Sequence, residues 1–581
     1  MLINSAKKIC LFLLFTITTY SHAQNSTFIT HFEKSKGMET ATYDETIQFY
    51  TDLSKTYKQI SIQPIGETDS GKPLHIVILN PDKEFDFGNI RNNKRILLIN
   101  NGIHPGESDG IDATMMLFRD IVQGKINMPK HTVLVTIPVY NIGGALNRNS
   151  TTRTNQNGPK EYGFRGNARN YDLNRDFIKC DTKNARSFSN IFHLVQPDVF
   201  IDNHVSNGAD YQYALTHLFT QHNKLGGDLG NYLHTELMPS LEQKLEAKNW
   251  PITPYVNVFN QVPEIGFSQF MDYPRYSTGY TTLFNTLGMM VETHMLKPYK
   301  QRVEGTYELM KSMIEIIEKD YAKIKELRKD SFKKIINNKT YPLDWAIDST
   351  KTTTLHFKGF EGEFIDSEIT GSKRLKYNRE KPFTKDVIYY NYAKPTVEIE
   401  IPKAYIIPQG WHPVIDLLQL NNVVMKPLAN DSIIKVQLYK IASYETRKMP
   451  YEGHYAHYNT KVSMEEKEVQ FYKGDLLIET NQSSVRYLLE TLEPIAPDSF
   501  FNWNFFDSIL QQKEYFSPYV WEDKTMELLN SNEELKKAFE AKKANDEKFA
   551  GNWYAQLDWL HKQSDHYEKT HMQYPVYRIT N

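Results

Sequence analysis

The sequence predicts an α/β fold with a mixed, largely parallel central sheet and helices on both faces. Residues 40–330 alternate short apolar runs with longer amphipathic ones, a pattern typical of strands connected by helices. The apolar runs lack polar interruptions, which indicates strands that are covered on both faces. These strands are expected at 74–80, 95–100, 132–139, 198–204 and 288–294.

Amphipathic segments fill the spaces around these strands. They predict helices at 44–57, 109–124, 184–195, 229–248 and 307–327. The SGK turn at 70–72 lies between two strand-like runs and predicts a hairpin at one edge. Such an edge would make the sheet mixed rather than purely parallel.

Beyond residue 330 the pattern changes. The basic stretch 328–340 is interpreted as a domain boundary, because short strands with turn residues follow it. The end of the chain is rich in aromatic residues, and its segment 499–529 is predicted to be helical. The C-terminal half as a whole could bind substrate, pack against the first domain or contact polymer. Structural support is its favoured role, and Trp411 and Trp503 are candidate contact residues. The predicted division is a leader at 1–23, a first domain at 24–330, a β-rich accessory module at 341–480 and an α-rich C-terminal segment at 481–581.

The N-terminus has the pattern of a signal peptide. Lys7 and Lys8 precede an apolar run at 9–20, and small residues lead to a cleavage position near Ala23/Gln24. The apolar run is shorter than the ~20 residues that a bilayer requires. We therefore expect a secreted or periplasmic protein with no membrane span after cleavage.

Composition argues against a nucleic-acid partner and against an internal disulfide. The formal net charge is -2, whereas nucleic-acid binding normally requires an excess of Lys and Arg, so no nucleic-acid partner is expected. After the leader is removed, Cys180 is the sole cysteine and cannot form an internal disulfide. A thiol nucleophile at Cys180 stays an alternative, although no His or Gly-rich turn adjoins it.

Metal-capable side chains follow two of the predicted strands. His104 and Glu107 lie in the HPGE loop after 95–100, and His204 ends the strand 198–204. Ligands collect at the carboxyl ends of strands in open α/β sheets, so polar residues at these positions are better candidates for ligand binding than the same residues elsewhere. Asp202 lies on the same strand face as His204 and could orient it. Taken singly, each group is more often structural than functional.

A third strand carries a carboxylate in apolar surroundings. Glu292 interrupts 288–294, where an unpaired charge is costly, so a salt bridge and a general base are the two interpretations. Two His, one Glu and an open position form the ligand set of a catalytic zinc site, beside which a separate carboxylate moves protons. No HExxH helix, the alternative route to these ligands, occurs in the sequence.

The order HPGE, NR, strand-end His and strand Glu resembles the M14 zinc carboxypeptidases over roughly residues 40–320. The resemblance implies that 24–330 is the catalytic domain. It also implies one Zn²⁺ per chain, with His104, Glu107 and His204 as the metal ligands and Glu292 as the base that activates the water.

The stretch between the second and third ligands is dense in Arg and Asn. The resemblance implies that Arg153 stabilises the oxyanion and that Asn174 and Arg175 bind the substrate's terminal carboxylate. Arginine suits that task, because its planar fork of donors matches a carboxylate. Three further arginines leave the oxyanion assignment open: Arg148, Arg165 and Arg169.

The family also uses a mobile tyrosine. The segment DYPRYSTGY offers Tyr273, Tyr276 and Tyr280, of which Tyr280 is favoured. The predicted function is therefore a metallocarboxypeptidase acting on peptides or proteins with a free C-terminus. Alternatives are a zinc amidase or endopeptidase acting on cell-wall or acylated amino-acid substrates, and an inactive binding protein with a peptidase fold.

Overall fold

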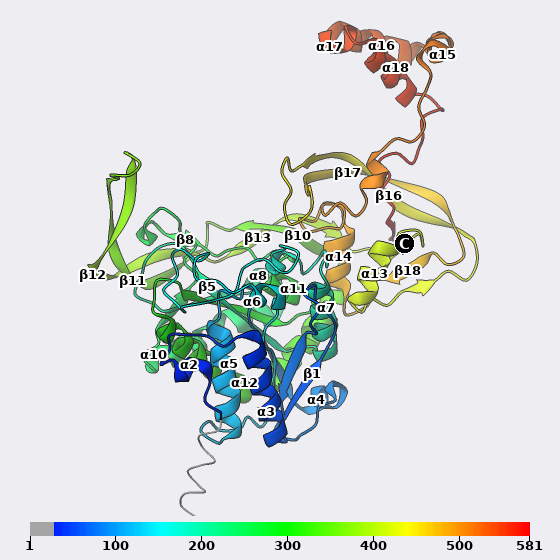
Figure 1. Cartoon of the computed structure of the whole chain (residues 1–581). Helices are drawn as coiled ribbons and strands as arrows, with labels where there is room; N and C mark the ends of the chain where they lie inside the picture. Colours follow the sequence, from blue (N-terminus) through cyan, green and yellow to red (C-terminus); the bar gives the residue numbers. More distant parts are fainter. Residues whose placement is uncertain (1–27, 581) are drawn as a thin grey trace, which may run out of the picture.

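A computed structural model describes residues 28–580, so the predicted leader lies outside the described residues. An eight-stranded sheet forms the centre of the first 300 residues (Figure 1). Its strands lie in the spatial order β1 (Ile60–Pro64), β2 (His75–Leu79), β4 (Thr132–Ile137), β3 (Arg95–Asn100), β5 (Val199–Ser206), β9 (Leu287–His294), β6 (Leu215–Phe219) and β7 (Ile252–Pro254). Strands β4, β3, β5 and β9 are parallel neighbours. β1 pairs antiparallel with β2, β2 with β4 and β6 with β9, whereas β7 is parallel to β6. The predicted mixed sheet and its edge hairpin are confirmed.

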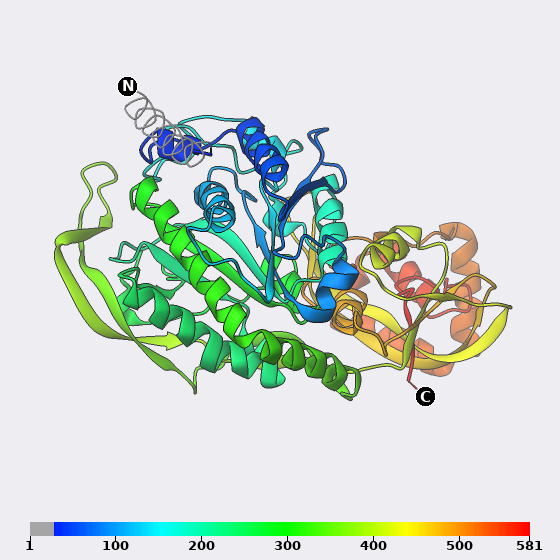
Figure 2. The ribbon, with the colours of Figure 1, turned by 90° about the horizontal axis from the view of Figure 1, so that it is seen from below.

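Helices cover both faces of this sheet. Successive residues of a strand point to opposite faces, and β5 shows the consequence. Its Phe200 packs against Phe188 of α7 (Lys183–Val195), with ring centroids 6.1 Å apart. Its Asn203 faces α12 (Tyr299–Ile336), where the amide nitrogen lies 3.9 Å from the Met310 sulfur. Figure 2 shows the long helix α12 running across the sheet.

The predicted helices form, with two differences in length. Residues 229–248 are divided by a π-helical turn at Leu233–Leu237, and 307–327 lies inside the longer α12. Helix α3 (Tyr43–Thr56) begins with a capping box between Thr42 and Glu45. The other helices of this region are α2 (His31–Lys34), α4 (Phe87–Asn93), α5 (Asp109–Val122), α6 (Ile142–Leu146), α8 (His222–Leu225), α9 (Gly227–Tyr232), α10 (Met238–Ala247) and α11 (Ser277–Thr282).

The chain beyond α12 is rich in strands, as predicted. The basic stretch 328–340 completes α12 and reaches β10 (Thr340–Ile347), which pairs with β13 (Ala393–Glu400). A long hairpin of β11 (Thr353–Asp366) and β12 (Lys373–Tyr390) projects from the body and pairs with β8 (Phe267–Ser268) (Figure 1). The six-stranded sheet contains, in order, β15 (Lys426–Pro427), β18 (Leu476–Glu479), β14 (Ala404–Ile407), β19 (Tyr577–Ile579), β16 (Ser432–Thr446) and β17 (His457–Phe471).

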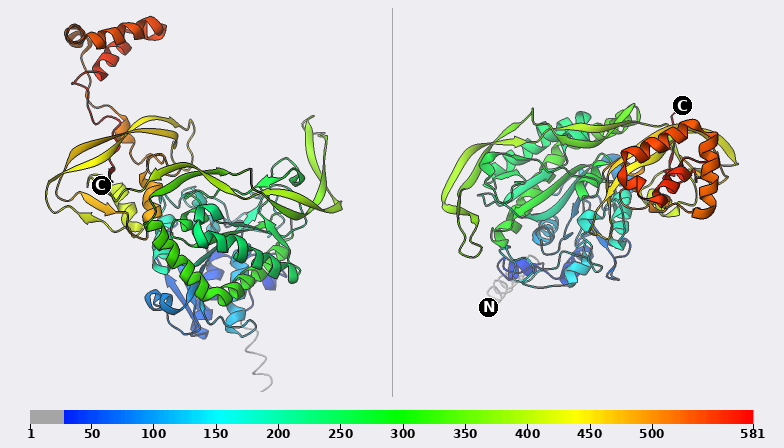
Figure 3. Two further views of the ribbon diagram at one scale, coloured as in Figure 1. Left: turned by 180° about the vertical axis from the view of Figure 1, so that it is seen from behind. Right: turned by 90° about the horizontal axis from the view of Figure 1, so that it is seen from above.

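The last hundred residues combine several kinds of structure. Strand β19 lies between β14 and β16, so the end of the chain joins the sheet of the β-rich region. The division at 480/481 therefore stays a prediction. Four helices form a cluster apart from the body (Figures 1 and 3), held by its own small core: α15 (Pro518–Ser531), α16 (Glu533–Asn545), α17 (Glu547–Ala550) and α18 (Trp553–Lys562).

Two expectations for this region are wrong. The predicted helical segment 499–529 is helical only from Pro518, because 499–517 forms turns and a short 3-10 helix, with Asn504 at a φ of +67°. Trp503 is 1% exposed, so it is a core residue rather than a surface contact. Among the described helices, none has both the length and the apolar character needed to cross a membrane.

Candidate metal centre

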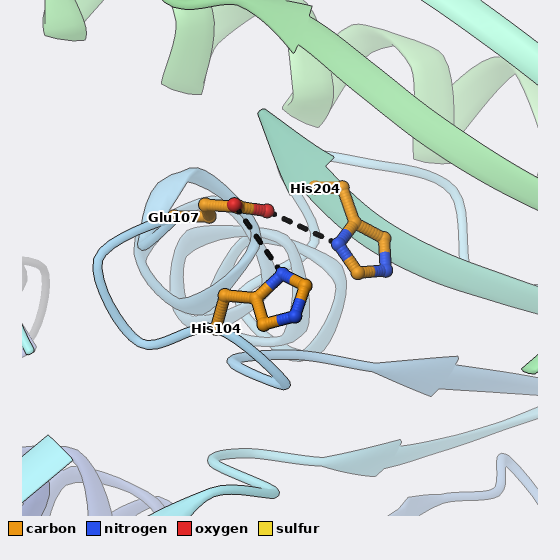
Figure 4. A group of neighbouring side chains, drawn as sticks. All are labelled: His104, Glu107 and His204. Carbon is orange, nitrogen blue, oxygen red and sulfur yellow. Dashed lines mark hydrogen bonds and ion pairs between the residues drawn. The ribbon is translucent and has the colours of Figure 1, made fainter. Parts of the chain in front are cut away.

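The carboxyl edge of the parallel strands brings three distant side chains together. β3 and β5 are parallel neighbours, with Asn100 opposite Asp202, so the loop after β3 lies beside the end of β5. That loop carries His104 and Glu107, and His204 belongs to β5. One ligand atom from each of the three residues lies within 4.8 Å of the others (Figure 4).

The two imidazoles approach the same carboxylate through the same ring atom. His104 Nδ1 lies 3.3 Å from Glu107 Oε1, and His204 Nδ1 lies 3.1 Å from Glu107 Oε2. Ligands about 2.0–2.1 Å from a tetrahedral zinc ion are roughly 3.3 Å apart. All three side chains are buried, so the spacing, the donor types and the burial fit a zinc ion.

The other ring nitrogen of each histidine is held by a carboxylate. His104 Nε2 lies 2.9 Å from Asp172 Oδ1, and His204 Nε2 lies 2.9 Å from Asp202 Oδ2. A carboxylate there fixes the proton on Nε2 and leaves the lone pair of Nδ1 directed at the centre. Asp202 was anticipated from strand alternation. Asp172 was missed, although it lies two residues before Asn174 in YDLNRDF.

Each ionisable group at the centre lies beside groups of the opposite charge. Burial opposes ionisation of Glu107, but the positive charges of His104 and Arg153 outweigh it and hold the pKa of Glu107 well below its usual value. Burial likewise opposes protonation of His204, but Asp202 and Glu107 raise its pKa well above the ordinary range. The carboxylates thus favour positive charge at this point, which a divalent ion supplies.

Glu292 lies beside His204 on the neighbouring strand. The two residues are opposite one another in the β5–β9 register. Glu292 is half-buried and lines a cavity of about 220 Å³ together with the three clustered side chains. No ion pair or side-chain hydrogen bond to its carboxylate occurs within residues 28–580, so the salt-bridge interpretation has no partner there. Burial raises the pKa of Glu292 to about 7.

Two arginines lie close to Glu107. Arg153 Nη2 is 3.0 Å from Glu107 Oε1, and its Nε donates to Gln156. Arg165 lines the cavity, while its Nη2 donates to Asp172 at 2.8 Å. The structure therefore brings both arginines to the centre.

Asn174 and Arg175 lie on the wall of the same cavity. The Arg175 guanidinium lies over the ring of Tyr276, 4.6 Å from its centroid, and Nη1 donates to the Asn174 carbonyl at 2.8 Å. The Asn174 side-chain oxygen accepts from the Ser277 backbone at 3.1 Å. These contacts place a planar cation at a fixed point beside the proposed metal position.

Comparison with known proteins finds a family model that matches part of the chain. Residues 46–198 match the zinc carboxypeptidase family, Peptidase_M14. The domain that contains these residues is similar to that family and is called the M14 domain. That match includes His104, Glu107 and the Arg-rich stretch, and it ends before β5. This part of the chain is accordingly similar to a family of zinc carboxypeptidases.

Longer matches to named proteins and matches to solved structures were also found. Carboxypeptidase 2 of Trichophyton rubrum is 20% identical over 491 residues, which cover 80% of this chain and 84% of that protein. Carboxypeptidase 2 of Trichophyton tonsurans is 20% identical over 503 residues, with the same coverage. The crystal structure of a metallo-carboxypeptidase from Burkholderia cenocepacia is 13% identical, covers 48% of this chain and 70% of its own, and gives a TM-score of 0.36.

The tyrosine favoured from the sequence does not reach the cavity of the M14 domain. Tyr280 is fully buried, and its hydroxyl donates to Asn421 at 2.7 Å. The Tyr273 hydroxyl donates a hydrogen bond to Asp344 Oδ1 at 3.1 Å. Tyr276 is the one of the three that lines the cavity. It caps α11, whereas Tyr280 lies one turn inside that helix and faces the core.

The alternative nucleophile of the M14 domain is unsuited to catalysis. Cys180 is 1% exposed and lies in the main hydrophobic core. Burial, with the nearby charge of Asp176, raises the pKa of its thiol to about 12. A thiol in this state carries almost no thiolate at neutral pH, so it is not a nucleophile.

Proposed function

We propose that this chain is a secreted or periplasmic metallocarboxypeptidase that removes the C-terminal residue from peptides or proteins. His104, Glu107 and His204 bind one zinc ion per chain. The observation that carries the proposal is the convergence of two Nδ1 atoms on one carboxylate, beside a cavity that also holds Glu292 and Arg175.

The chemistry divides between the metal and the protein. Zinc at this position supplies a Lewis acid and a water of lowered pKa. Glu292 accepts the proton of the attacking water on its carboxylate and later delivers it to the leaving amine. The absence of an ion-pair partner among the described residues keeps that carboxylate free for both transfers. Burial raises the pKa of Glu292, which makes it a stronger base and favours the first transfer.

The cavity wall defines how a substrate would lie. Arg175 and Asn174 would bind the free carboxylate, because a planar guanidinium can donate two hydrogen bonds to it. Apolar side chains form another part of the lining: Leu218, Phe270 and Met290. These side chains suit an apolar C-terminal residue, so a peptide ending in Phe is the appropriate test substrate.

Replacement of Arg175 by Ala tests whether the free carboxylate is recognised. We expect kcat/KM for a peptide ending in a free Phe to fall about 100-fold, because a charged, hydrogen-bonded contact is lost. Cleavage of the C-terminally amidated peptide should be slow in the parent enzyme and unaffected by the substitution. If the parent cleaves the amide as fast as the acid, the amidase or endopeptidase function is correct instead.

Replacing each arginine by Ala in turn identifies the oxyanion donor. We expect Arg153→Ala to lower kcat about 100-fold or more with little change in KM, as for loss of an oxyanion donor. Arg165→Ala should affect kcat mainly through the lost contact with Asp172, and the fall in kcat should be smaller than for Arg153→Ala. The control is Arg169→Ala, since Arg169 is exposed and donates to the Asp181 carbonyl. A larger kcat loss for Arg165→Ala would transfer the role to Arg165.

A further inference from the structure

The C-terminal half of the chain directly contacts the segment 172–181, which carries Arg175. The connection between β16 and β17 contains a tight turn, Tyr451–His454, closed by two backbone hydrogen bonds between its end residues. Tyr451 Oη accepts a hydrogen bond from Arg175 Nε at 3.0 Å. The two residues are 276 positions apart in the sequence, so the contact depends on how the two halves of the chain pack.

This turn makes two further contacts with the same segment. Glu452 accepts a hydrogen bond from the Asp172 backbone at 2.8 Å, and Asp172 in turn holds the ring of His104. His454 Nε2 lies 2.7 Å from Asp181 Oδ2. Together these contacts secure the segment on both sides of Arg175.

The backbone of the turn is adapted to close approach. Glu452 has a φ of +49° and Gly453 a φ of +82°, a region that side-chain-bearing residues rarely adopt. A Cβ at Gly453 would lie 2.5 Å from the Tyr171 hydroxyl. Such strain persists where surrounding structure enforces it, and here it allows the turn to sit against the cavity wall.

Tyr451 is itself held rigidly. Its ring is stacked near that of Trp503, with centroids 6.2 Å apart and planes 19° apart. The Trp503 indole donates to Asp498 at 3.2 Å, and Asp498 pairs with Arg275 at 2.9 Å. The hydroxyl of Tyr451 therefore contacts Arg175 from a fixed position, and the same guanidinium lies over the ring of Tyr276.

The geometry points to Tyr451 as a positioning residue for substrate recognition, supplied to the M14 domain by the C-terminal half. This inference rests on the proposed function, since it assigns Arg175 to the terminal carboxylate. The Nε of Arg175 is occupied by Tyr451 and one Nη1 donor by the Asn174 carbonyl, so the other Nη donors remain available for a substrate carboxylate. The β-rich half thereby completes the substrate pocket rather than serving only as support.

Tyr451→Phe tests this role, because it removes the hydroxyl and keeps the ring on Trp503. The measurement is the Kd of benzoyl-Gly-Phe, determined by calorimetry on full-length protein carrying Glu292→Gln to prevent turnover. We expect Tyr451→Phe to weaken binding about tenfold, the loss of one hydrogen bond to a charged group. The matched control is Tyr458→Phe, on β17, whose side chain is 40% exposed, and it should change Kd by less than about twofold.

A double-mutant cycle separates positioning from a general structural effect. If Tyr451 acts through Arg175, Tyr451→Phe should cause no further weakening in the Arg175→Ala background. An unchanged Kd for Tyr451→Phe, or equal weakening with and without Arg175, would overturn the inference. Failure of the parent enzyme to hydrolyse benzoyl-Gly-Phe would instead overturn the proposed function, and the binding comparison would still decide the role of Tyr451.

Discussion

Replacing Glu292 by Gln is expected to lower kcat for peptide hydrolysis by about 10²–10⁴-fold, the usual contribution of a general base. The amide has nearly the same shape as the carboxylate but cannot accept the proton of the attacking water. Zinc content and KM should change little, because Glu292 is not among the three converging ligands. Steady-state kinetics and elemental analysis of the same preparation provide both measurements.

The pH profile gives this prediction a second readout. Burial raises the pKa of Glu292 to about 7 in the metal-free protein, and a bound cation lowers that value. The base must be ionised, so kcat/KM should fall as the pH drops through the pKa of Glu292, somewhere below about 7. Glu326→Gln, on the exposed surface of α12, is the matched control and should keep the parent profile. Parent-like kcat in Glu292→Gln would remove Glu292 from the mechanism.

Replacing His204 by Ala is expected to abolish both zinc binding and activity. Two ligands remain, and the buried Glu107 and Asp202 lose the imidazole that lies between them. Zinc per chain should fall from about one to below about one tenth, since catalytic zinc sites need three protein ligands. His356→Ala, on the exposed hairpin strand β11, is the control and should keep its zinc.

Thermal unfolding offers a readout of the same site that does not depend on activity. A ligand that binds only the folded state stabilises it by about 4 kcal/mol when its free concentration is a thousandfold above Kd. A chelator should therefore lower the Tm of the parent protein and of His356→Ala, but not that of His204→Ala. A full complement of zinc in His204→Ala, with a chelator-sensitive Tm, would contradict the ligand assignment.

The central sheet and the converging metal-capable residues could be predicted because both follow from local patterns. The strands at 95–100 and 198–204 are continuous apolar runs, and parallel strands place their carboxyl ends at one edge. His104, Glu107 and His204 follow or end those strands, so their proximity needed no long-range information. Asp202 could be anticipated for the same reason, because side chains alternate along a strand.

The supporting residues could not be predicted, because they depend on side-chain direction and distant packing. Three tyrosines lie within eight residues of DYPRYSTGY, and their spacing does not show that Tyr276 faces the cavity while Tyr280 enters the aromatic core beside Phe188. Tyr451 reaches Arg175 across 276 positions, and no local pattern in its own segment indicates that contact.

The most direct test is a digest of one defined peptide ending in Phe, and of its amide, by metal-depleted protein to which zinc is added stepwise. Mass spectrometry should show loss of the single C-terminal residue from the free acid, with activity rising to a plateau at about one zinc per chain. Three results would contradict the account: internal fragments, cleavage of the amide as fast as that of the free acid, or activity that does not change when zinc is added.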